Sequence, residues 1–327
     1  MAPYESGAPS APALSQKTGV YDEAFKLYMA AQPGTEIYYT TDGSIPTVNS
    51  AKYTGSIQIS CRNGEKNVLC SEENIKKMDI AGSGYDYVPE DSEVDKCTII
   101  RAAAIAPDGT SSSVITNSYF VGNDMANKYK GATVASLVMD PNDLLDYNTG
   151  ILALGAYYDE WRKTAEAKQI IQSKAYWNYE GNYTQSGKGW ERQATMDYID
   201  PSTGNVEFSA PMGVRLHGGA SRMYGQKSFK FYMREEYGQK NLKYALIPGD
   251  VDKDGKQIKK YKGFMLRNGG NDTELTKIRD VFIQSCITDR AYGTQAARPC
   301  VLFLNGEYWG LYNLTERYSD NNFEENY

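Results

Sequence analysis

The stretch GVRLHGGASRMYGQKSFKFYM, residues 213–233, decides how the second half of the chain is interpreted. It consists of a strand-like run, a glycine-rich turn that contains an arginine, and a second strand-like run that carries two lysines. Glycine turns let backbone N–H groups converge on an anion because no Cβ blocks the approach, and an arginine adds a planar fork of donors. The stretch predicts a β-hairpin and raises the question of whether that hairpin holds phosphate.

The two lysines of this hairpin are predicted to lie on opposite faces of the sheet. Lys227 and Lys230 are three residues apart, and side chains alternate between faces along a strand. Only one of them is expected to reach a ligand on the inner face of the sheet. The glycine pattern alone favours an ordinary hairpin over a nucleotide site, because the spacing of the usual kinase loop and a V-A-I-K strand are absent.

Length and charge exclude several classes of protein. The chain has 327 residues, enough for two domains, with 35 basic and 41 acidic residues. Residues 1–120 carry 9 basic and 15 acidic groups, whereas residues 121–327 carry 26 of each. This distribution lacks the basic footprint of a nucleic-acid-binding protein. The sequence contains no run of about 18 apolar residues, so it predicts no membrane span.

The N-terminal stretch MAPYESGAPSAPALS has neither the basic region nor the apolar core of a secretory signal. We interpret residues 1–13 as a linker that joins an upstream segment. The chain contains no CxxC pair and a single histidine, His217, so a structural zinc site or a histidine metal cluster is not expected. Whether a disulfide forms among Cys61, Cys70 and Cys97 is left open, because it depends on the compartment.

Residues 14–121 are predicted to form an all-β immunoglobulin-like sandwich. Short strand-like runs alternate with turn signals at Pro33-Gly34, Asp42-Gly43 and Asp108-Gly109. Residues 62–96 are polar and acidic and interrupt this rhythm, so we interpret them as an insertion between two strands.

Residues 131–327 are predicted to form an α+β domain that consists of an antiparallel sheet and one main helix. A helix is expected within 158–173 because of its good helix formers, and a second one in TKIRDVFIQSCITDR, residues 276–290. There Ile278, Val281, Phe282 and Cys286 fall at helical spacing, and Asp272 or Thr273 is the expected N-cap. The Asn305-Gly306 pair predicts a β-hairpin turn.

The segments EIYYTTDGSIPT, YTGSI, IIRAAAI and TNSYFV resemble the immunoglobulin-like module at the C-terminus of chitobiase-type enzymes. The resemblance implies an accessory spacer or a carbohydrate-associated unit. We favour the spacer, since a sandwich fold alone implies no site, and keep glycan contact through exposed tyrosines as the alternative.

The segments GVRLHGGASR, QKSFKFYMREEYG, LRNGGND with the later RD, and LNGEYWGLYNLTERY together resemble the spore-coat CotH family of atypical, secreted protein kinases. The similarity runs from about residue 132 to the end. It implies the fold of a kinase N-terminal lobe, ATP with Mg²⁺ as cofactor, and phosphorylation of Ser or Thr in an exported protein. It also implies an extracellular or cell-surface location, with a coat or cell-surface protein as partner.

The resemblance places a nucleotide under the HGGASR turn. Lys230 is the favoured strand lysine, with Lys227 as its competitor, and Asp280 is the expected ion-pair partner. The backbone from Leu314 to Glu316 is expected near the adenine, whereas Tyr308 and Trp309 are expected to pack in the hairpin. The predicted cofactor-binding residues are Gly218, Gly219, Ser221, Arg222, Lys227, Lys230, Arg279, Asp280, Leu314 and Glu316. Arg279 and Glu316 also have structural interpretations, as a partner of loop carbonyls and as a strand end.

The catalytic base and the Mg²⁺-binding Asp of a kinase follow the hinge, so they are expected beyond Tyr327. We therefore expect this chain to be catalytically inactive alone and to expose apolar surface where a second lobe would pack. A non-catalytic cell-surface or coat scaffold is the alternative. A carbohydrate-active enzyme is disfavoured, because no paired carboxylates stand at recognisable strand ends.

Overall fold

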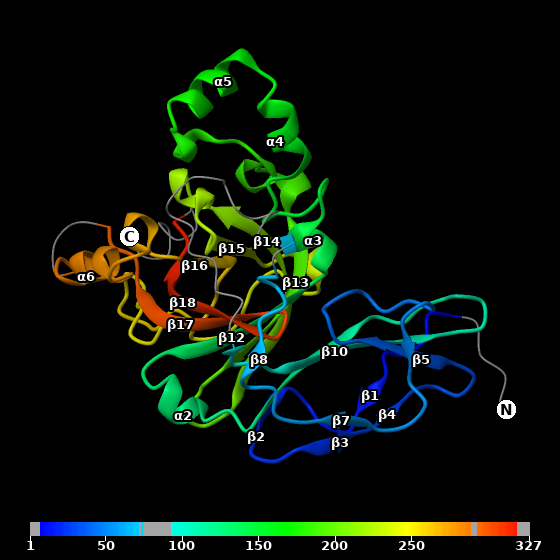
Figure 1. Ribbon diagram of the computed structural model, residues 1–327. Coiled ribbons are helices and arrows are strands. Elements are labelled where there is room, and N and C mark those ends of the chain that lie inside the picture. The colour runs from blue at the N-terminus through cyan, green and yellow to red at the C-terminus, as the bar shows by residue number, and fades with distance from the viewer. Residues whose placement is uncertain (1–6, 72, 75–92, 289–292, 319–327) are drawn as a thin grey trace.

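The computed structural model describes residues 7–71, 73–74, 93–288 and 293–318, which form an N-terminal β module followed by a β-barrel (Figure 1). The N-terminal module contains a five-stranded sheet in the order β2-β11-β10-β5-β6, together with the strand pairs β3-β7 and β1-β4. Its strands are β1 (Ala13–Leu14), β2 (Gly19–Tyr21), β3 (Phe25–Leu27), β4 (Met29–Ala30), β5 (Glu36–Thr40), β6 (Ala51–Lys52), β7 (Ile57–Ile59), β10 (Thr98–Ile105) and β11 (Ile115–Val121).

The strands of this module coincide with the alternating segments of the sequence. Leu27, Ile59, Ile100 and Tyr119 are fully buried in one cluster between the sheet and the smaller strand pairs. The predicted all-β, immunoglobulin-like N-terminal region is therefore confirmed. Within the predicted insertion, β8 (Glu65–Lys66) pairs with β9 (Glu93–Val94), and residues 72 and 75–92 lie outside the described residues.

The second half of the chain forms a closed barrel in the order β12-β13-β14-β15-β16-β18-β17. Every neighbouring pair is antiparallel except β12 and β17, whose parallel pairing closes the barrel. The predicted antiparallel sheet is thus confirmed, and its closure is an additional feature. The strands are β12 (Thr133–Met139), β13 (Arg192–Ile199), β14 (Val206–His217), β15 (Ser228–Tyr232), β16 (Gly263–Arg267), β17 (Ala297–Leu304) and β18 (Glu307–Glu316).

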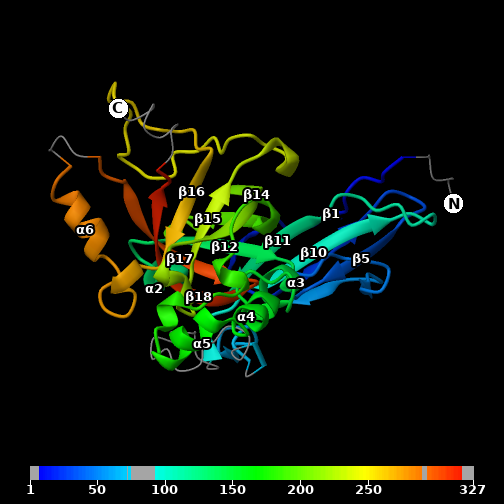
Figure 2. The same cartoon turned by 90° about the horizontal axis from the view of Figure 1, so that it is seen from above.

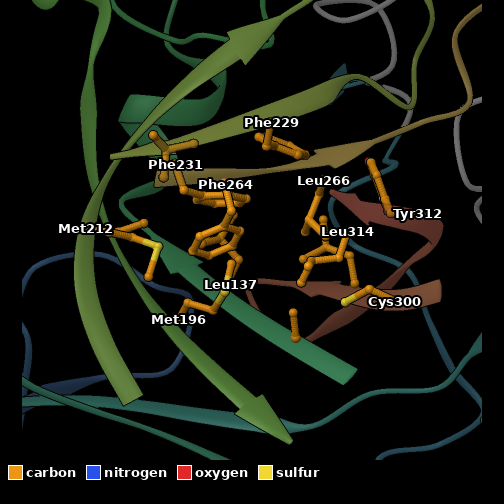
Figure 3. Packing of buried hydrophobic residues seen from close by; sticks show 14 of the residues in the cluster. Leu137, Met196, Met212, Phe229, Phe231, Phe264, Leu266, Cys300, Tyr312 and Leu314 are labelled. Atoms are coloured by element: carbon orange, nitrogen blue, oxygen red, sulfur yellow. The ribbon is translucent and has the colours of Figure 1, made fainter. Parts of the chain in front are cut away.

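Alternate side chains of every barrel strand fill its interior. Figure 3 shows Phe229, Phe231 and Phe264 pointing toward Leu266 and Leu314 across this core, and the rings of Phe231 and Phe264 lie 4.8 Å apart. Because successive residues of a strand face opposite sides, their neighbours in sequence must lie on the outer face. The filled interior leaves no room for a ligand inside the barrel, so any site has to use the outer face or the ends.

The helix expected within residues 158–173 is in fact two short helices, α4 (Gly155–Trp161) and α5 (Ala165–Gln172). Thr164 separates them, because its side chain accepts a hydrogen bond from the Ala167 N–H and caps α5. Three single turns follow, η1 (Tyr176–Asn178), η2 (Asn182–Thr184) and η3 (Lys188–Trp190). We call residues 154–190 the helical insertion, which extends from the barrel at the top of Figure 1.

The remaining helices are short. They are α2 (Met125–Lys128), α3 (Pro141–Leu145), α6 (Arg279–Ser285), η4 (Ala220–Met223), η5 (Glu235–Tyr237) and η6 (Gly270–Asp272). α6 begins later than predicted, with Ile278 rather than Asp272 or Thr273 at its N-cap. Asp272 still contributes, since its side chain accepts from the Arg279 N–H at 3.0 Å. No helix of the described residues is both long and apolar enough to cross a membrane.

The apolar residues of α6 are exposed rather than buried: Ile278, Phe282 and Ile283 keep 47, 62 and 54% of their surface accessible. The helical spacing was recognised correctly, but the described part of the chain supplies nothing that covers this side. Figure 2 shows α6 and the N-terminal module on opposite sides of the barrel.

The N-terminal module packs on the outer face of β12 and β17. Phe120 from β11 meets Phe303 from β17 edge to face, with ring centroids 5.0 Å apart, and Ile99, Val138 and Val301 join the same cluster. This apolar packing joins the two units directly, without a free linker between them.

A buried ion pair reinforces this seam. The Lys96 amine lies 2.9 Å from the Glu307 carboxylate, and their side chains are only 1 and 8% exposed. The same carboxylate accepts hydrogen bonds from the backbone N–H groups of Val68 and Leu69. Cys70, which follows, is buried within the barrel core cluster. Contacts from residues 62–96 therefore hold the N-terminal module against the β17–β18 hairpin.

The question of disulfides, left open by the sequence, has a plain answer in the structure. All five cysteines are free thiols, with Cys61 and Cys286 exposed and the other three buried. Burial raises the pKa of the Cys97 and Cys300 thiols to about 12, so both are protonated at neutral pH.

Candidate functional site

The glycine-rich turn connects β14 to β15 as predicted, but it contains a helical turn. Gly218 has φ +122°, a backbone conformation that favours glycine, and a Cβ there would lie 2.5 Å from the Ser221 hydroxyl. Gly219 precedes η4, whose first closing bond runs from the Arg222 N–H to the Gly219 carbonyl at 3.1 Å. The turn is therefore compact and internally hydrogen-bonded.

The helical insertion holds this turn in place. Arg222 donates to the Thr184 carbonyl at 2.5 Å, and Met223 is buried against Tyr179 and Tyr183. The planar fork that the sequence assigned to phosphate thus already has one partner in the insertion, although its Nε remains without one among the described residues. The main structural role of Arg222 is to anchor the turn.

Lys227 and Lys230 lie on opposite sides of the strand, as predicted. Lys227 is fully buried, donates to the Tyr224 carbonyl at 2.7 Å, and lies over the ring of Tyr183. Lys230 is half-buried on the outer face, paired across the sheet with Arg215 and Met265. It forms no hydrogen bond or ion pair with any described residue, which makes it the lysine with an amine available to a ligand.

Four cationic side chains gather around one tyrosine on this outer face. The ring centroid of Tyr232 lies 4.5 Å from the Arg215 guanidinium, 4.7 Å from that of Arg317, 5.1 Å from that of Arg234 and 5.8 Å from the Lys230 amine. Cations favour the face of an aromatic ring, but they repel one another. We call these four residues with Tyr232 the cationic cluster.

One buried carboxylate forms ion pairs with two of these cations. Glu191, whose side chain is fully buried, lies 2.7 Å from both Arg215 and Arg234 and accepts from the Tyr237 hydroxyl at 2.9 Å. Burial raises the pKa of Glu191, but the hydrogen bonds from Arg234, Tyr237 and Arg215 outweigh it and lower the pKa to about 2. Lys230 and Arg317 have no such partner among the described residues.

His217 reports the same excess of positive charge. Burial, followed by the charges of Lys230, Arg267, Arg222 and Arg317, lowers its pKa to about 4. The imidazole is therefore neutral at physiological pH. For the same reasons, burial and then the charges of Arg317 and Arg215 lower the pKa of Lys230.

The two predicted residues of α6 have partners other than the strand lysine. Asp280 forms an ion pair with Arg267 from β16, and Arg279 lies 3.1 Å from the Asp272 carboxylate. Lys230 pairs with Met265, and Arg267, two residues further along β16, shares that face. Asp280 therefore meets the face that carries Lys230, but no contact between Asp280 and the lysine is present among the described residues. Repositioning of α6 would be required to form the expected Lys230–Asp280 pair.

The backbone of Leu314 and Glu316 is occupied by the sheet. Leu314 pairs with Leu266 on one side and Arg298 on the other, and its side chain fills the barrel core. The Glu316 carbonyl accepts from the Gln295 side chain at 2.8 Å. Neither residue presents a free backbone edge to an adenine. Tyr308 and Trp309 pack in the hairpin region, and Trp309 is buried, in agreement with the structural interpretation.

The cationic cluster was only partly recognised in the sequence. Lys230 was singled out, whereas Arg215, Arg234, Arg317, Tyr232 and Glu191 were missed. Alternation offered a signal for some of them, since Arg215 and His217 share one face of β14, and Lys230 and Tyr232 share one face of β15. Nothing in the sequence connects Arg317, at the end of β18, with that face.

A second concavity lies away from these residues. A cavity of about 870 Å³ between the N-terminal module and the barrel is lined by Asp42, Arg62, Tyr147, Asp146 and Glu307, among others. Two of its polar groups, Glu307 and Arg62, already form hydrogen bonds at the seam. Among the described residues, no group of three or more His, Cys, Asp or Glu side chains is arranged to hold a metal ion.

Two family models match the chain. Residues 214–327 match the model described as CotH kinase protein, and residues 25–119 match the model described as Fn3 associated. No curated protein matches the chain. The chain therefore contains a CotH-like region preceded by an immunoglobulin-like module, and the first match suggests a kinase-like fold. The matched region begins at Val214, so it includes Arg215, Lys230, Tyr232 and Arg317 but excludes Glu191 and the helical insertion.

Proposed function

We propose that the CotH-like region binds the phosphates of ATP, with Mg²⁺, on the outer face of β14, β15, β16 and β18. In the whole protein this region would be the nucleotide-binding part of a kinase that transfers phosphate to Ser or Thr of an exported protein. The location would be extracellular or at the cell surface. The family resemblance supports the choice of ATP, whereas the charge on the outer face supports the choice of this surface.

The observation that carries the proposal is the unpaired amine of Lys230. A half-buried cation with no carboxylate partner is unfavourable, because desolvation and neighbouring cations both oppose its charge. An anionic ligand removes that cost. Bound ATP would place its phosphates beside Lys230, with the neutral His217 adjacent as a further hydrogen-bonding group. Mg²⁺ would offset part of the phosphate charge when bound.

The test is a calorimetric titration of the chain with ATP and Mg²⁺ at low ionic strength. Lys230→Met should weaken binding by about tenfold or more, since a hydrogen bond to a charged group is lost without removing the stem of the side chain. Lys259→Met is the matched control, because Lys259 is exposed on the β15–β16 connection. It should bind ATP as the unmodified chain does.

Equal affinities for the two variants would contradict the proposed site. If the unmodified chain binds no ATP, the non-catalytic scaffold becomes the better account. In that case both modules serve display or assembly, with the seam as the structural reason for a rigid unit.

A further inference from the structure

We propose that Arg317 and Lys230, which both lie beside the Tyr232 ring, form the phosphate clamp of this chain, in place of the backbone amides of the glycine-rich turn. The inference rests on the proposed function and deepens it, because it assigns the polyphosphate to specific side chains. The ligand class is a di- or triphosphate, whose several negative charges match a pair of cations.

Arg317 is held by the fold rather than projecting freely. It follows the last residue of β18, and its guanidinium lies 4.7 Å from the Tyr232 centroid. Its side chain passes over Gly263, where a Cβ would lie 3.6 Å from the Arg317 Cδ. Gly263 pairs directly with Tyr232 across the sheet, so the absence of a side chain there leaves the ring open to the guanidinium.

The hydrogen-bonding state of Arg317 independently indicates a missing acceptor. Its Nε is buried and has no hydrogen-bond partner among the described residues. Buried donors are nearly always paired, so an unpaired guanidinium N–H beside an unpaired ammonium is a site for an oxyanion. Phosphate suits it, because arginine binds phosphate oxygens through parallel N–H bonds while lysine acts as a point charge.

The other two cations of the cluster share one carboxylate. Glu191 pairs with both Arg215 and Arg234 and offsets part of their charge, so they contribute less to a ligand. Lys230 and Arg317 have no carboxylate partner among the described residues, and the charge of Arg317 acts on the amine of Lys230. A polyphosphate between them would convert this repulsion into two attractive contacts.

The glycine-rich turn is a poor competitor for the same phosphate. Arg222 is bonded to Thr184, and the turn is closed by its own Arg222–Gly219 bond. A phosphate at the turn would share the Arg222 guanidinium with the helical insertion, which already holds one of its nitrogens. Arg317 forms no hydrogen bond or ion pair with the described residues, so it is the stronger candidate.

The experiment compares Arg317→Gln with Arg162→Gln, an exposed arginine of the helical insertion that pairs with Asp159 and lies over the Tyr158 ring. Each variant and the unmodified chain is titrated calorimetrically with ATP, with inorganic triphosphate and with adenosine. We expect Arg317→Gln to lower the affinity for ATP and for triphosphate by about tenfold or more. Adenosine should be unaffected, and Arg162→Gln should behave as the unmodified chain.

The outcomes separate the clamp from the proposed function. ATP binding that Arg317→Gln leaves unchanged would overturn the clamp and leave the nucleotide site standing. Triphosphate binding that depends on Arg317, without any preference for ATP, would support the clamp and overturn the nucleotide proposal. A chain that binds neither ligand overturns both.

Discussion

Two parts of the outer surface of the barrel differ in whether their cations are paired with carboxylates. The face formed by β12 and β17 is covered by the N-terminal module, and the cation at that seam, Lys96, is matched by Glu307. The face formed by β14, β15, β16 and β18 has more cations than carboxylates, with Lys230 and Arg317 unmatched among the described residues. The first face therefore joins the two units, whereas the second is the face on which we propose that a ligand binds.

The largest expected effect is at the matched seam. Removing one member of a buried ion pair leaves the other charge buried alone, which costs about 3–5 kcal/mol. Glu307→Gln should therefore lower the free energy of unfolding by about that amount in a urea titration, with the Val68 and Leu69 N–H groups losing their charged acceptor as well. Glu36→Gln, at the half-exposed Lys52–Glu36 pair, should leave the midpoint unchanged. A similar midpoint for the two variants would contradict a structural role for the seam pair.

A second buried carboxyl at the seam, Asp197, has no cationic partner among the described residues, and its effect on stability should run in the opposite direction. Asp197 accepts from the hydroxyls of Thr18 at 3.0 Å and Ser118 at 2.8 Å, and the Ser209 side chain on the neighbouring strand also acts on it. Burial raises its pKa. The folded state therefore binds the proton more tightly than the unfolded state. Stability is greatest below the unfolded pKa of about 4 and falls as the pH rises through the folded pKa.

Asp197→Asn should remove this dependence. The variant should be more stable than the unmodified chain at pH 7, and the difference should shrink toward pH 4. Thermal melts across that range measure it. A variant that is less stable at every pH would show that the carboxylate is satisfied by the surrounding hydroxyls.

A smaller effect is expected at the proposed ligand face, from the ion pair between Asp280 and Arg267. Asp280 pairs with Arg267 at the surface, so Asp280→Asn should change the unfolding free energy by less than about 1 kcal/mol. Because it releases Arg267 and adds net positive charge, it should tighten ATP binding at low ionic strength by about two- to fivefold. Calorimetry of this variant decides between two roles. Weaker binding would support the role that the family resemblance gave Asp280, as the partner of the strand lysine.

The sequence predicted those features that local patterns determine. Alternation located the strands, and Asn305-Gly306 located the β17–β18 turn, where Asn305 has φ +46°. The separation of Lys227 and Lys230 onto two faces followed from their spacing alone. The closure of the barrel did not, because it depends on the parallel pairing of β12 with β17, more than 160 residues apart, for which there is no local signal.

The site was harder to predict for the same reason. Arg215 lies opposite Lys230 only in the pairing that the length of the glycine-rich turn determines. Arg317 follows β18, and β16 lies between β18 and the strand that carries Lys230. The partner of Asp280 depends on where α6 begins, and that start was predicted about one turn or more too early. Residue types at single positions indicate chemistry, whereas their convergence is a property of the packed sheet.

The central claim is that an anion binds among these cations, and the His217 ring provides a single signal that tests it. The chain has a single histidine, so the proton NMR signal of the His217 ring can be followed without ambiguity during a pH titration. The free chain should titrate near pH 4, because burial and the surrounding cations lower that pKa. Saturating ATP should raise the pKa, since the phosphates offset the positive charges. A titration midpoint that ATP leaves unchanged would contradict the account.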